Sequence, residues 1–198
     1  LFRSRFILHN DCQKLYIGGL ARIPFLVAYG AFLRNITSQI LYFDKFHRKG
    51  NWSLLNQENC AIAFDEFELV TDANENGDLG ISIGFSAPIS NDQLPSQLKE
   101  FTTILKPNTS IERNLVKNQE NLEQISEAVR DIIDNLSRHG KRVHLFLSVQ
   151  SSLAIELGRR YQEGTQCNWV IHNYNFEKKE YDWAIELSKT GIKEFRFD

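Results

Sequence analysis

Hydrophobic residues recur at helical spacing in the middle of the chain, and this is the clearest pattern in the sequence. Between residues 118 and 139 the apolar side chains lie three or four positions apart, which predicts an amphipathic helix. The apolar positions of this segment are Leu122, Ile125, Val129, Ile132, Ile133 and Leu136. Gly140 follows the last turn, where a glycine in the left-handed conformation commonly ends a helix. We therefore expect a helix over 118–139 with Gly140 as its C-cap.

Two apolar runs with a helical segment between them follow this helix. Residues 143–149 form an uninterrupted run rich in β-formers, which is typical of a strand buried on both faces. Residues 153–161 have helical spacing, and residues 168–176 form the second apolar run. Strands that alternate with helices in this way predict a parallel, Rossmann-like sheet.

The segment before the central helix adds further elements. Residues 61–70 and 78–86 both have the composition of strands. After the break at Ala87-Pro88, Asn91 or Asp92 can cap a helix. The apolar positions of that helix would be Leu94, Leu98, Phe101 and Leu105. Residues 106–119 are polar, and we expect them to form a surface connection.

The first third of the chain repeats the order of elements in the last third. Residues 14–19, 21–33 and 38–46 predict a strand, a helix and a second strand. Aligning Gly30 with Gly158 places Phe46 opposite Tyr174 and gives Trp52 and Trp183 similar places. Any two strand–helix–strand units resemble one another, so the alignment alone leaves duplication open. We expect an α/β fold with mainly parallel sheets, built from two related halves over about 1–70 and 71–198.

Size and composition are those of an ordinary globular domain. The chain has 198 residues, of which 42% are hydrophobic and 24% are charged, and its net charge is −2. A chain this close to neutral has no overall basic field to attract long nucleic acid. A local pocket can still be positive and bind a small anion.

The cysteines and the hydropathy pattern bear on the location of the protein. Cys12, Cys60 and Cys167 are far apart and form no CxxC pair, which argues against a disulfide or zinc framework and favours a reducing cytoplasm. No apolar stretch is long enough to span a membrane, and no signal peptide is visible. Because the chain starts at Leu1 and contains no Met, we expect it to be part of a longer polypeptide.

Motifs for catalysis and metal binding are not found. The sequence has no Walker A loop, GxSxG or HExxH motif, so no catalytic constellation is expected. Residues 72–77 match the start of an EF-hand loop, but Ile83 stands where the bidentate Glu belongs, and strands flank the segment. We interpret it as a solvated acidic turn and expect no metal site. His144 and His172 lie inside apolar strands and are expected to be packed core histidines.

Three short loops each follow an apolar strand and precede a helix. They cover residues 18–24, 86–90 and 150–152 and are rich in small and polar residues. In open α/β sheets, ligands bind outside the carboxyl ends of the strands, where helix N-termini present free N–H groups to anions. Aromatic and cationic residues gather near the second strands, and such residues stack on nucleobases and meet phosphates. These features favour a phosphate-bearing ligand.

The order of these elements resembles a known family. Residues 144–187, HLFLSVQSSLAIELGRRYQEGTQCNWVIHNYNFEKKEYDWAIEL, resemble the C-terminal signature of SAVED domains. That signature has an apolar strand, a small-residue loop, a helix with an LAxxLGR-like core, a strand that ends near a tyrosine, and a Tyr-x-x-Ala/Trp segment. Residues 78–98 resemble the middle strand and loop of the family, and residues 21–33 with the following strand and Trp52 resemble its N-terminal half. The resemblance therefore covers nearly the whole chain.

The resemblance implies a single sensor domain made of two fused CARF-like halves, with a cyclic di- or trinucleotide bound between them. It also implies a fused effector, which we expect to be an N-terminal DNA endonuclease of HNH type that ligand-driven self-association activates in anti-phage (CBASS) defence. The domain itself would not be an enzyme and would need no cofactor. Two alternatives stay open: a ring-nuclease-like enzyme that cleaves cyclic oligonucleotides, and a structural oligomerisation module.

The loops and the resemblance together predict the ligand contacts. Backbone N–H groups of 86–88 and 150–152 are expected to meet phosphate or ribose, although Ser151 or Ser152 can equally serve as a helix N-cap. Phe46, Trp52 and Tyr174 are expected to stack on bases. The full predicted set is Phe46, Trp52, Phe85, Ser86, Ala87, Pro88, Gln150, Ser151, Ser152, Asn173 and Tyr174, with Lys45, Arg22 and Arg159 as additional cationic candidates.

Overall fold

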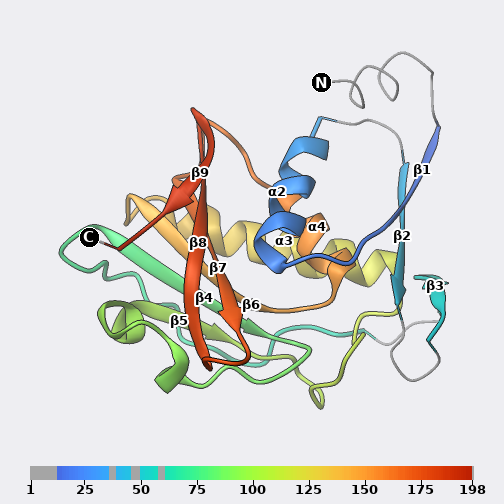
Figure 1. Cartoon of the computed structure of the whole chain (residues 1–198), viewed down its shortest axis with the longest axis horizontal. Coiled ribbons are helices and arrows are strands. Elements are labelled where there is room, and N and C mark those ends of the chain that lie inside the picture. The colour runs from blue at the N-terminus through green and yellow to red at the C-terminus, as the bar shows by residue number, and fades with distance from the viewer. Residues whose placement is uncertain (1–12, 36–38, 46–49, 58–60, 198) are drawn as a thin grey trace.

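Two β-sheets and three α-helices make up the described part of the chain (Figure 1). The computed structural model describes residues 13–35, 39–45, 50–57 and 61–197. The smaller sheet has the strand order β1-β2-β3, and the larger has the order β5-β4-β6-β7-β8-β9. The strands are β1 (Lys14–Gly18), β2 (Gln39–Lys45), β3 (Trp52–Leu54), β4 (Asp78–Gly84), β5 (Thr102–Leu105), β6 (Arg142–Ser148), β7 (Asn168–Asn175), β8 (Glu180–Ser188) and β9 (Gly191–Phe195). The helices are α2 (Ile23–Leu33), α3 (Gln119–Leu136) and α4 (Ser151–Arg159).

Parallel strands form the centre of the fold. Parallel pairing joins β1 to β2, and it continues through the larger sheet from β5 over β4 and β6 to β7. Strands β3, β8 and β9 are added antiparallel. Helix α2 connects β1 to β2 and helix α4 connects β6 to β7, so each sheet contains a β-α-β unit. The expected α/β fold with two partly parallel sheets is confirmed, while the boundary near residue 70 stays a prediction.

Helices α2 and α4 pack against each other between the two sheets (Figure 1). Each helix also contacts the sheet to which its partner helix's β-α-β unit belongs. Helix α2 contacts β7 and β8 of the larger sheet, and helix α4 contacts β1 and β2 of the smaller sheet. One continuous cluster of buried apolar side chains includes Ile17 and Ile40 from the smaller sheet and Ile81 and Leu145 from the larger. The two sheets therefore share a core.

A pair of glycines sets the distance between these two helices. A Cβ atom on Gly30 would lie 1.9 Å from the carbonyl oxygen of Ile155, and one on Gly158 would lie 1.9 Å from that of Val27. The alignment of Gly30 with Gly158 also places Val27 on Ile155, so the same contact is made from each helix. Only glycine allows two backbones to approach this closely. The internal alignment therefore has a structural counterpart.

The strand registers correct that alignment by one residue after the helices. Lys14 and Arg142 correspond in that alignment, and they pair with Gln39 and Asn168. Six residues after Gln39 and Asn168 stand Lys45 and Tyr174, so Lys45 rather than Phe46 corresponds to Tyr174. Lys45 pairs with Trp52, and Tyr174 pairs with Tyr181. Tyr181, and not Trp183, therefore takes the place of Trp52.

Two segments have structures other than the predicted ones. Residues 91–105 form 3₁₀ helices over Asn91–Gln93 and Ser96–Phe101 and then strand β5, so the predicted α-helix is wrong. Pro95 has no N–H to continue a helix, and the β-branched residues of β5 suit pairing with β4. Residues 61–70 form no named strand, and an isolated bridge joins Phe64 to Pro107.

Helix α3 begins at a side-chain cap, and a closely packed glycine follows its last turn. Asn118 caps α3 by accepting bonds from the N–H groups of Glu120 and Asn121. Gly140 does not have a positive φ, so the predicted left-handed C-cap is wrong. A Cβ there would lie 2.9 Å from Leu79 Cδ1, and close packing is thus the reason for this glycine.

No helix in the described ranges is long and apolar enough to cross a membrane.

The segment that resembles a calcium loop is a turn that leads into β4. Asn74 Oδ1 accepts bonds from the N–H groups of Asn76 and Asp78, at 3.0 and 2.9 Å. Gly77 has a φ of 80°, a conformation that favours glycine. The Asn and Gly residues of 72–77 thus shape the backbone of the turn.

Candidate ligand cavity

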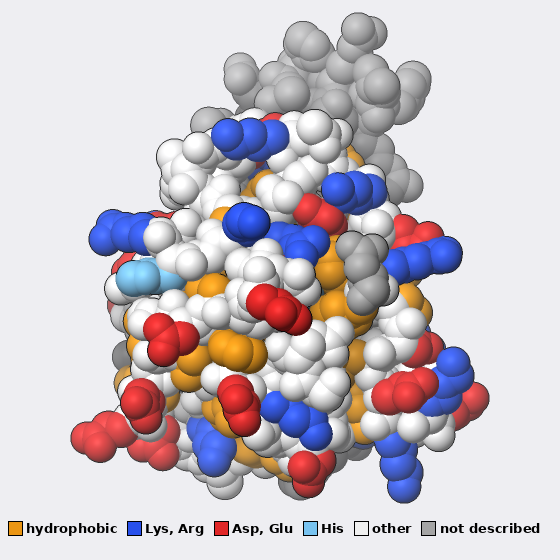
Figure 2. Space-filling view, turned by 90° about the vertical axis from the view of Figure 1, so that its left-hand side faces the viewer, with side chains coloured by type: hydrophobic (Ala, Val, Ile, Leu, Met, Phe, Trp, Pro, Cys, Tyr) orange, Lys and Arg blue, Asp and Glu red, His pale blue; other side chains and the backbone are white. Residues whose placement is uncertain are grey.

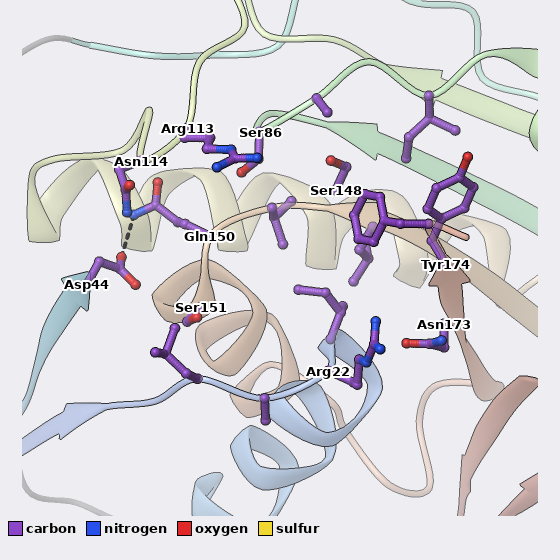
Figure 3. A pocket seen from close by; sticks show the side chains of 18 of the residues that line it. Arg22, Asp44, Ser86, Arg113, Asn114, Ser148, Gln150, Ser151, Asn173 and Tyr174 are labelled. Carbon is purple, nitrogen blue, oxygen red and sulfur yellow. Dashed lines mark hydrogen bonds between the residues drawn. The ribbon is translucent and has the colours of Figure 1, made fainter. Parts of the chain in front are cut away.

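A cavity of about 560 Å³ lies where the carboxyl ends of β6 and β7 approach the smaller sheet (Figure 3). Its wall includes Ser148 at the end of β6, Asn173 and Tyr174 near the end of β7, and Lys45 at the end of β2. In α/β folds this edge of the sheet is where helix N-termini face a ligand. The position of the cavity is therefore the one that the sequence predicts.

All three predicted loops contribute to this cavity. Residues 20–23 come from the loop before α2 and its first residue, residues 86–89 from the loop after β4, and Gln150 and Ser151 from the start of α4. The loops meet because β4 and β6 are parallel neighbours and because α2 packs on α4. A ligand in the cavity would touch structure from both sheets.

Three cationic side chains line the cavity without an ion-pair partner in the described ranges. They are Arg22 before α2, Lys45 on β2, and Arg113 in the connection before α3. Arg142 and Arg159, in contrast, each pair with a carboxylate. Cations and carboxylates are interspersed on the face drawn in Figure 2. Three cations that have no ion-pair partner among the described residues thus gather at one cavity, although the whole chain carries a net charge of −2.

A buried carboxylate, Asp44, lies at the floor of the cavity. Its Oδ1 accepts a bond from the backbone N–H of Ser152 at 3.1 Å, and its Oδ2 accepts one from Gln150 Nε2 at 2.6 Å. The Ser152 hydroxyl also donates to Oδ2. Burial raises the pKa of Asp44, while the bonds from Ser152 and Gln150 act to lower it. A carboxylate of this chain thus occupies the N-terminus of α4.

Aromatic rings form another wall of the cavity. Tyr174 packs edge-on against Phe176 and Tyr181, and the ring centroids are 5.2 Å apart in both pairs. The Gln93 amide donates a 2.7 Å bond to the Tyr174 hydroxyl, which holds that ring in place. Phe176 is 76% exposed, so its ring is free to stack on a flat ligand group.

The structure places most of the predicted contacts in the cavity wall and some outside it. Those in the wall are Ser86, Ala87, Pro88, Gln150, Ser151, Asn173 and Tyr174, together with Arg22 and Lys45. Phe46 lies outside the described residues. Trp52, Phe85, Ser152 and Arg159 do not line the wall.

Two of the residues outside the wall are aromatic. Trp52 lies on β3 over Gly18, where a Cβ atom would be 3.0 Å from the indole ring. Phe85 is buried, and its ring centroid lies 5.5 Å from that of Phe64. Trp52 thus packs on Gly18 and Phe85 on Phe64, and neither ring lies in the cavity wall.

The other two residues outside the wall make polar contacts elsewhere. Ser152 is buried and bonded to Asp44, so its N–H does not face the cavity. Arg159 donates a 2.7 Å bond to Glu156, a buried carboxylate that also accepts a 2.7 Å bond from the Tyr42 hydroxyl. The guanidinium therefore neutralises a charge next to the helix pair.

The sequence analysis missed several wall residues, of which Arg113 and Asn114 are the most informative. They belong to the stretch 106–119, which was expected to be a surface connection. The apolar pair Leu115-Val116 interrupts the polar pattern of this stretch, and both residues are buried. That pair indicates that the connection turns into the core beside the cavity. Asp44, Phe176 and Tyr181 were missed as well.

Parallel strands joined by helices, with a cavity at the carboxyl ends of the strands, define an α/β domain of the Rossmann-like class. The family model SAVED, "SMODS-associated and fused to various effectors sensor domain", matches residues 3–187. The chain belongs to the SAVED family, as the resemblance predicted. The family description makes it a sensor domain.

Solved structures with the same fold include SAVED/CARF-domain containing receptors named Cap4. The Acinetobacter baumannii receptor with the cyclic trinucleotide 2'3'3'-cAAA has a TM-score of 0.62 and 19% identity, over 91% of this chain and 40% of that chain. The same receptor with 3'3'3'-cAAA has a TM-score of 0.61 and 18% identity, over 88% and 39%. The Moraxella osloensis receptor has a TM-score of 0.52 and 20% identity, over 88% and 37%. The chain thus spans about two fifths of these receptors' length. No curated protein sequence matches the chain.

Proposed function

We propose that this domain binds a cyclic trinucleotide in the cavity of Figure 3 and acts as a sensor that leaves the ligand intact. The observation that carries the proposal is a set of three cations, Arg22, Lys45 and Arg113, that have no ion-pair partner in the described part of the chain and surround a cavity with an open aromatic wall. Phosphates need cations and N–H groups, and bases need flat apolar surfaces. The trinucleotide ring size is supported by the ligands named for the two Acinetobacter structures.

Each part of the cavity would meet a different part of the ligand. The three cations would contact phosphates, and the rings of Tyr174 and Phe176 would stack on bases. Small side chains at 86–88 would let the ligand approach the backbone closely. No covalent step is assigned to any of these groups.

Binding would act by shifting a population of conformations. Arg22 and Lys45 come from the unit of the smaller sheet, whereas Ser86 and Tyr174 come from the larger sheet. A ligand that touches both favours the arrangement it bridges by its difference in affinity between arrangements. Because the family is fused to various effectors, this change would promote self-association and activate an attached effector, for which we propose a DNA endonuclease.

Isothermal titration of the domain against cyclic di-, tri- and tetranucleotides tests the proposal, and the titrated samples are then analysed for linear products. We expect binding of a cyclic trinucleotide without cleavage. Linear products would favour the ring-nuclease alternative. Absence of binding across the panel would favour a structural module.

A pair of arginine variants locates the site. Arg22→Ala should weaken binding roughly tenfold or more, since a charge-assisted contact to phosphate is lost. Arg138→Ala is the matched control, because Arg138 is exposed at the end of α3 and does not line the cavity. Equal effects of the two substitutions would move the site away from this cavity.

A further inference from the structure

Asp44 joins elements of the two sheets at the floor of the cavity. The residue lies on β2 of the smaller sheet, yet its partners Gln150 and Ser152 start α4, the helix of the larger sheet's β-α-β unit. Asp44 is 1% exposed, and its two oxygens accept three donors. No cation is bonded to it among the described residues, so amide and hydroxyl dipoles alone hold the charge.

Gln150 connects Asp44 to a third segment, the stretch that contains Val116. Its Oε1 accepts the backbone N–H of Val116 at 2.8 Å, and its Nε2 donates to the Val116 carbonyl, also at 2.8 Å. Val116 is buried, and the same short segment carries Arg113 into the cavity, on the side of the Gln150 amide (Figure 3). Asn114 between them has a φ of 57°, which reverses the chain direction locally. The loop position thus depends on the orientation of one amide.

We propose that Asp44 is a positioning residue for ligand recognition: its carboxylate fixes the Gln150 amide, and that amide holds the loop that presents Arg113 to the cavity. The ligand step rests on the proposed function. The loop-holding step does not, because it can be measured in the free protein.

The charge and acceptor capacity of Asp44 are what this role requires. Replacing it by Asn puts an NH₂ group where both present oxygens accept, so one donor must face either Ser152 or the Nε2 of Gln150. The Ser152 N–H is fixed in the backbone and the Ser152 hydroxyl can accept a bond, so the NH₂ group takes the Oδ2 position and meets Nε2 of Gln150. To avoid that contact the Gln150 side chain has to turn, and it then loses both bonds to Val116. Asp44→Asn keeps the side-chain volume, so the effect is specific to the hydrogen bonds.

Hydrogen exchange in the free protein tests the loop-holding step. In Asp44→Asn the Val116 amide should exchange roughly tenfold faster or more, since its bond to Gln150 is lost. Amides in α3 and β6 should keep their rates, which shows that the fold is intact. Gln150→Met removes the same amide and should give the same result should Asp44→Asn fold poorly. Unchanged exchange at Val116 in a folded Asp44→Asn would overturn the role of Asp44, and unchanged exchange in Gln150→Met would overturn the loop-holding role of the Gln150 amide.

A double-mutant cycle with 3'3'3'-cAAA as the probe tests the ligand step. Asp44→Asn and Arg113→Ala should each weaken binding by a similar factor, and the double variant should be no weaker than either. Asp44→Asn combined with Arg22→Ala should be additive, because Arg22 is carried by a different loop. Additive losses in both cycles would overturn the link to Arg113. Lack of binding by the unmodified domain would instead count against the proposed function, and the exchange result alone would then decide the role of Asp44.

Discussion

Phe176 is the most exposed aromatic residue of the cavity wall, at 76% exposure, and few protein contacts depend on it. Phe176→Ala should weaken binding of the cyclic trinucleotide by about 1–3 kcal/mol, roughly 5- to 150-fold, because a base loses its stacking partner. The melting temperature should not change. Titration calorimetry and thermal unfolding give the two quantities.

Phe32 provides the control for this prediction. It lies on α2, is 74% exposed and does not line the cavity, so Phe32→Ala removes an equally exposed ring elsewhere. Its affinity for the ligand should equal that of the unmodified domain. Comparable losses for the two variants would show that Phe176 has no particular role in binding.

At the scale of single residues the sequence predicts positions better than partners. The residues of 86–88 and 150–151 could be placed in the cavity because strand–loop–helix order is a local property. The contacts of Ser152 could not be predicted, because its partner Asp44 is 108 residues away in the chain. Arg113 was missed for a related reason: its segment is bonded to the core through Val116 and Gln150, which are 34 residues apart in the chain.

At the scale of elements, the contact between α2 and α4 gives the sharpest prediction. Gly30→Ala and Gly158→Ala should each destabilise the domain by about 3 kcal/mol, since the new methyl group meets a backbone carbonyl that cannot move independently. Denaturant unfolding measures the change. Gly19→Ala is the control, because a Cβ there would be 3.4 Å from Leu26 Cδ2, an ordinary contact. A tolerated alanine at both helix positions would contradict the close packing of these helices.

Elements with their own periodicity were predictable, and elements defined by a distant partner were not. Helix α3 carries a complete apolar face and its own N-cap, so its sequence specifies it. Strand β5 follows a 3₁₀ turn and exists because it pairs with β4, where Gly80 leaves room for Thr102. Strand β8 depends likewise on pairing with β7, and β9 on pairing with β8, and their polar residues conceal a strand pattern.

At the scale of the molecule, the sequence indicates two related α/β units but not how they fit together. Each unit's helix also packs on the other unit's sheet, and this exchange has no local sequence pattern. It follows from two helices that are apolar on more than one side and therefore need two covered faces. The cavity is a consequence of this arrangement, because it brings the loop before α2 next to the ends of β6 and β7.

Two buried histidines on the larger sheet make the stability of the whole molecule depend on pH. His144 Nδ1 and His172 Nε2 are 2.8 Å apart, and one ring donates to the other. Burial lowers the pKa of both rings. The charge of Arg142 adds to this effect at His144, where Asp78 and Glu186 oppose it, and a charge on His144 adds to it at His172. Both rings are thus neutral in the folded state at neutral pH, as expected for core histidines.

The sign of the dependence follows from the lowered pKa. An unfolded histidine titrates near pH 6.5, so below that pH the unfolded chain binds protons that the folded chain does not. Stability is complete above about pH 6.5 and falls as the pH decreases, by at most about 1.4 kcal/mol per pH unit for each ring. Although burial opposes it, bonding to His144 and Arg142 lowers the pKa of Asp78, and the stability from that group is lost only at more acidic pH.

Urea unfolding between pH 7.5 and 5, read by tryptophan fluorescence, to which the buried Trp169 contributes, measures this dependence. The double variant His144→Leu/His172→Leu removes both titrating rings and keeps an apolar fill, so its stability should vary much less over the same range. Its stability at pH 7.5 is the internal reference, since replacement of two packed rings changes the absolute value. If the stability of the unmodified domain stays constant down to pH 5, both rings take up protons in the folded state. That result would contradict the lowered pKa values that we infer from the burial of these rings beside Phe146 and Phe197.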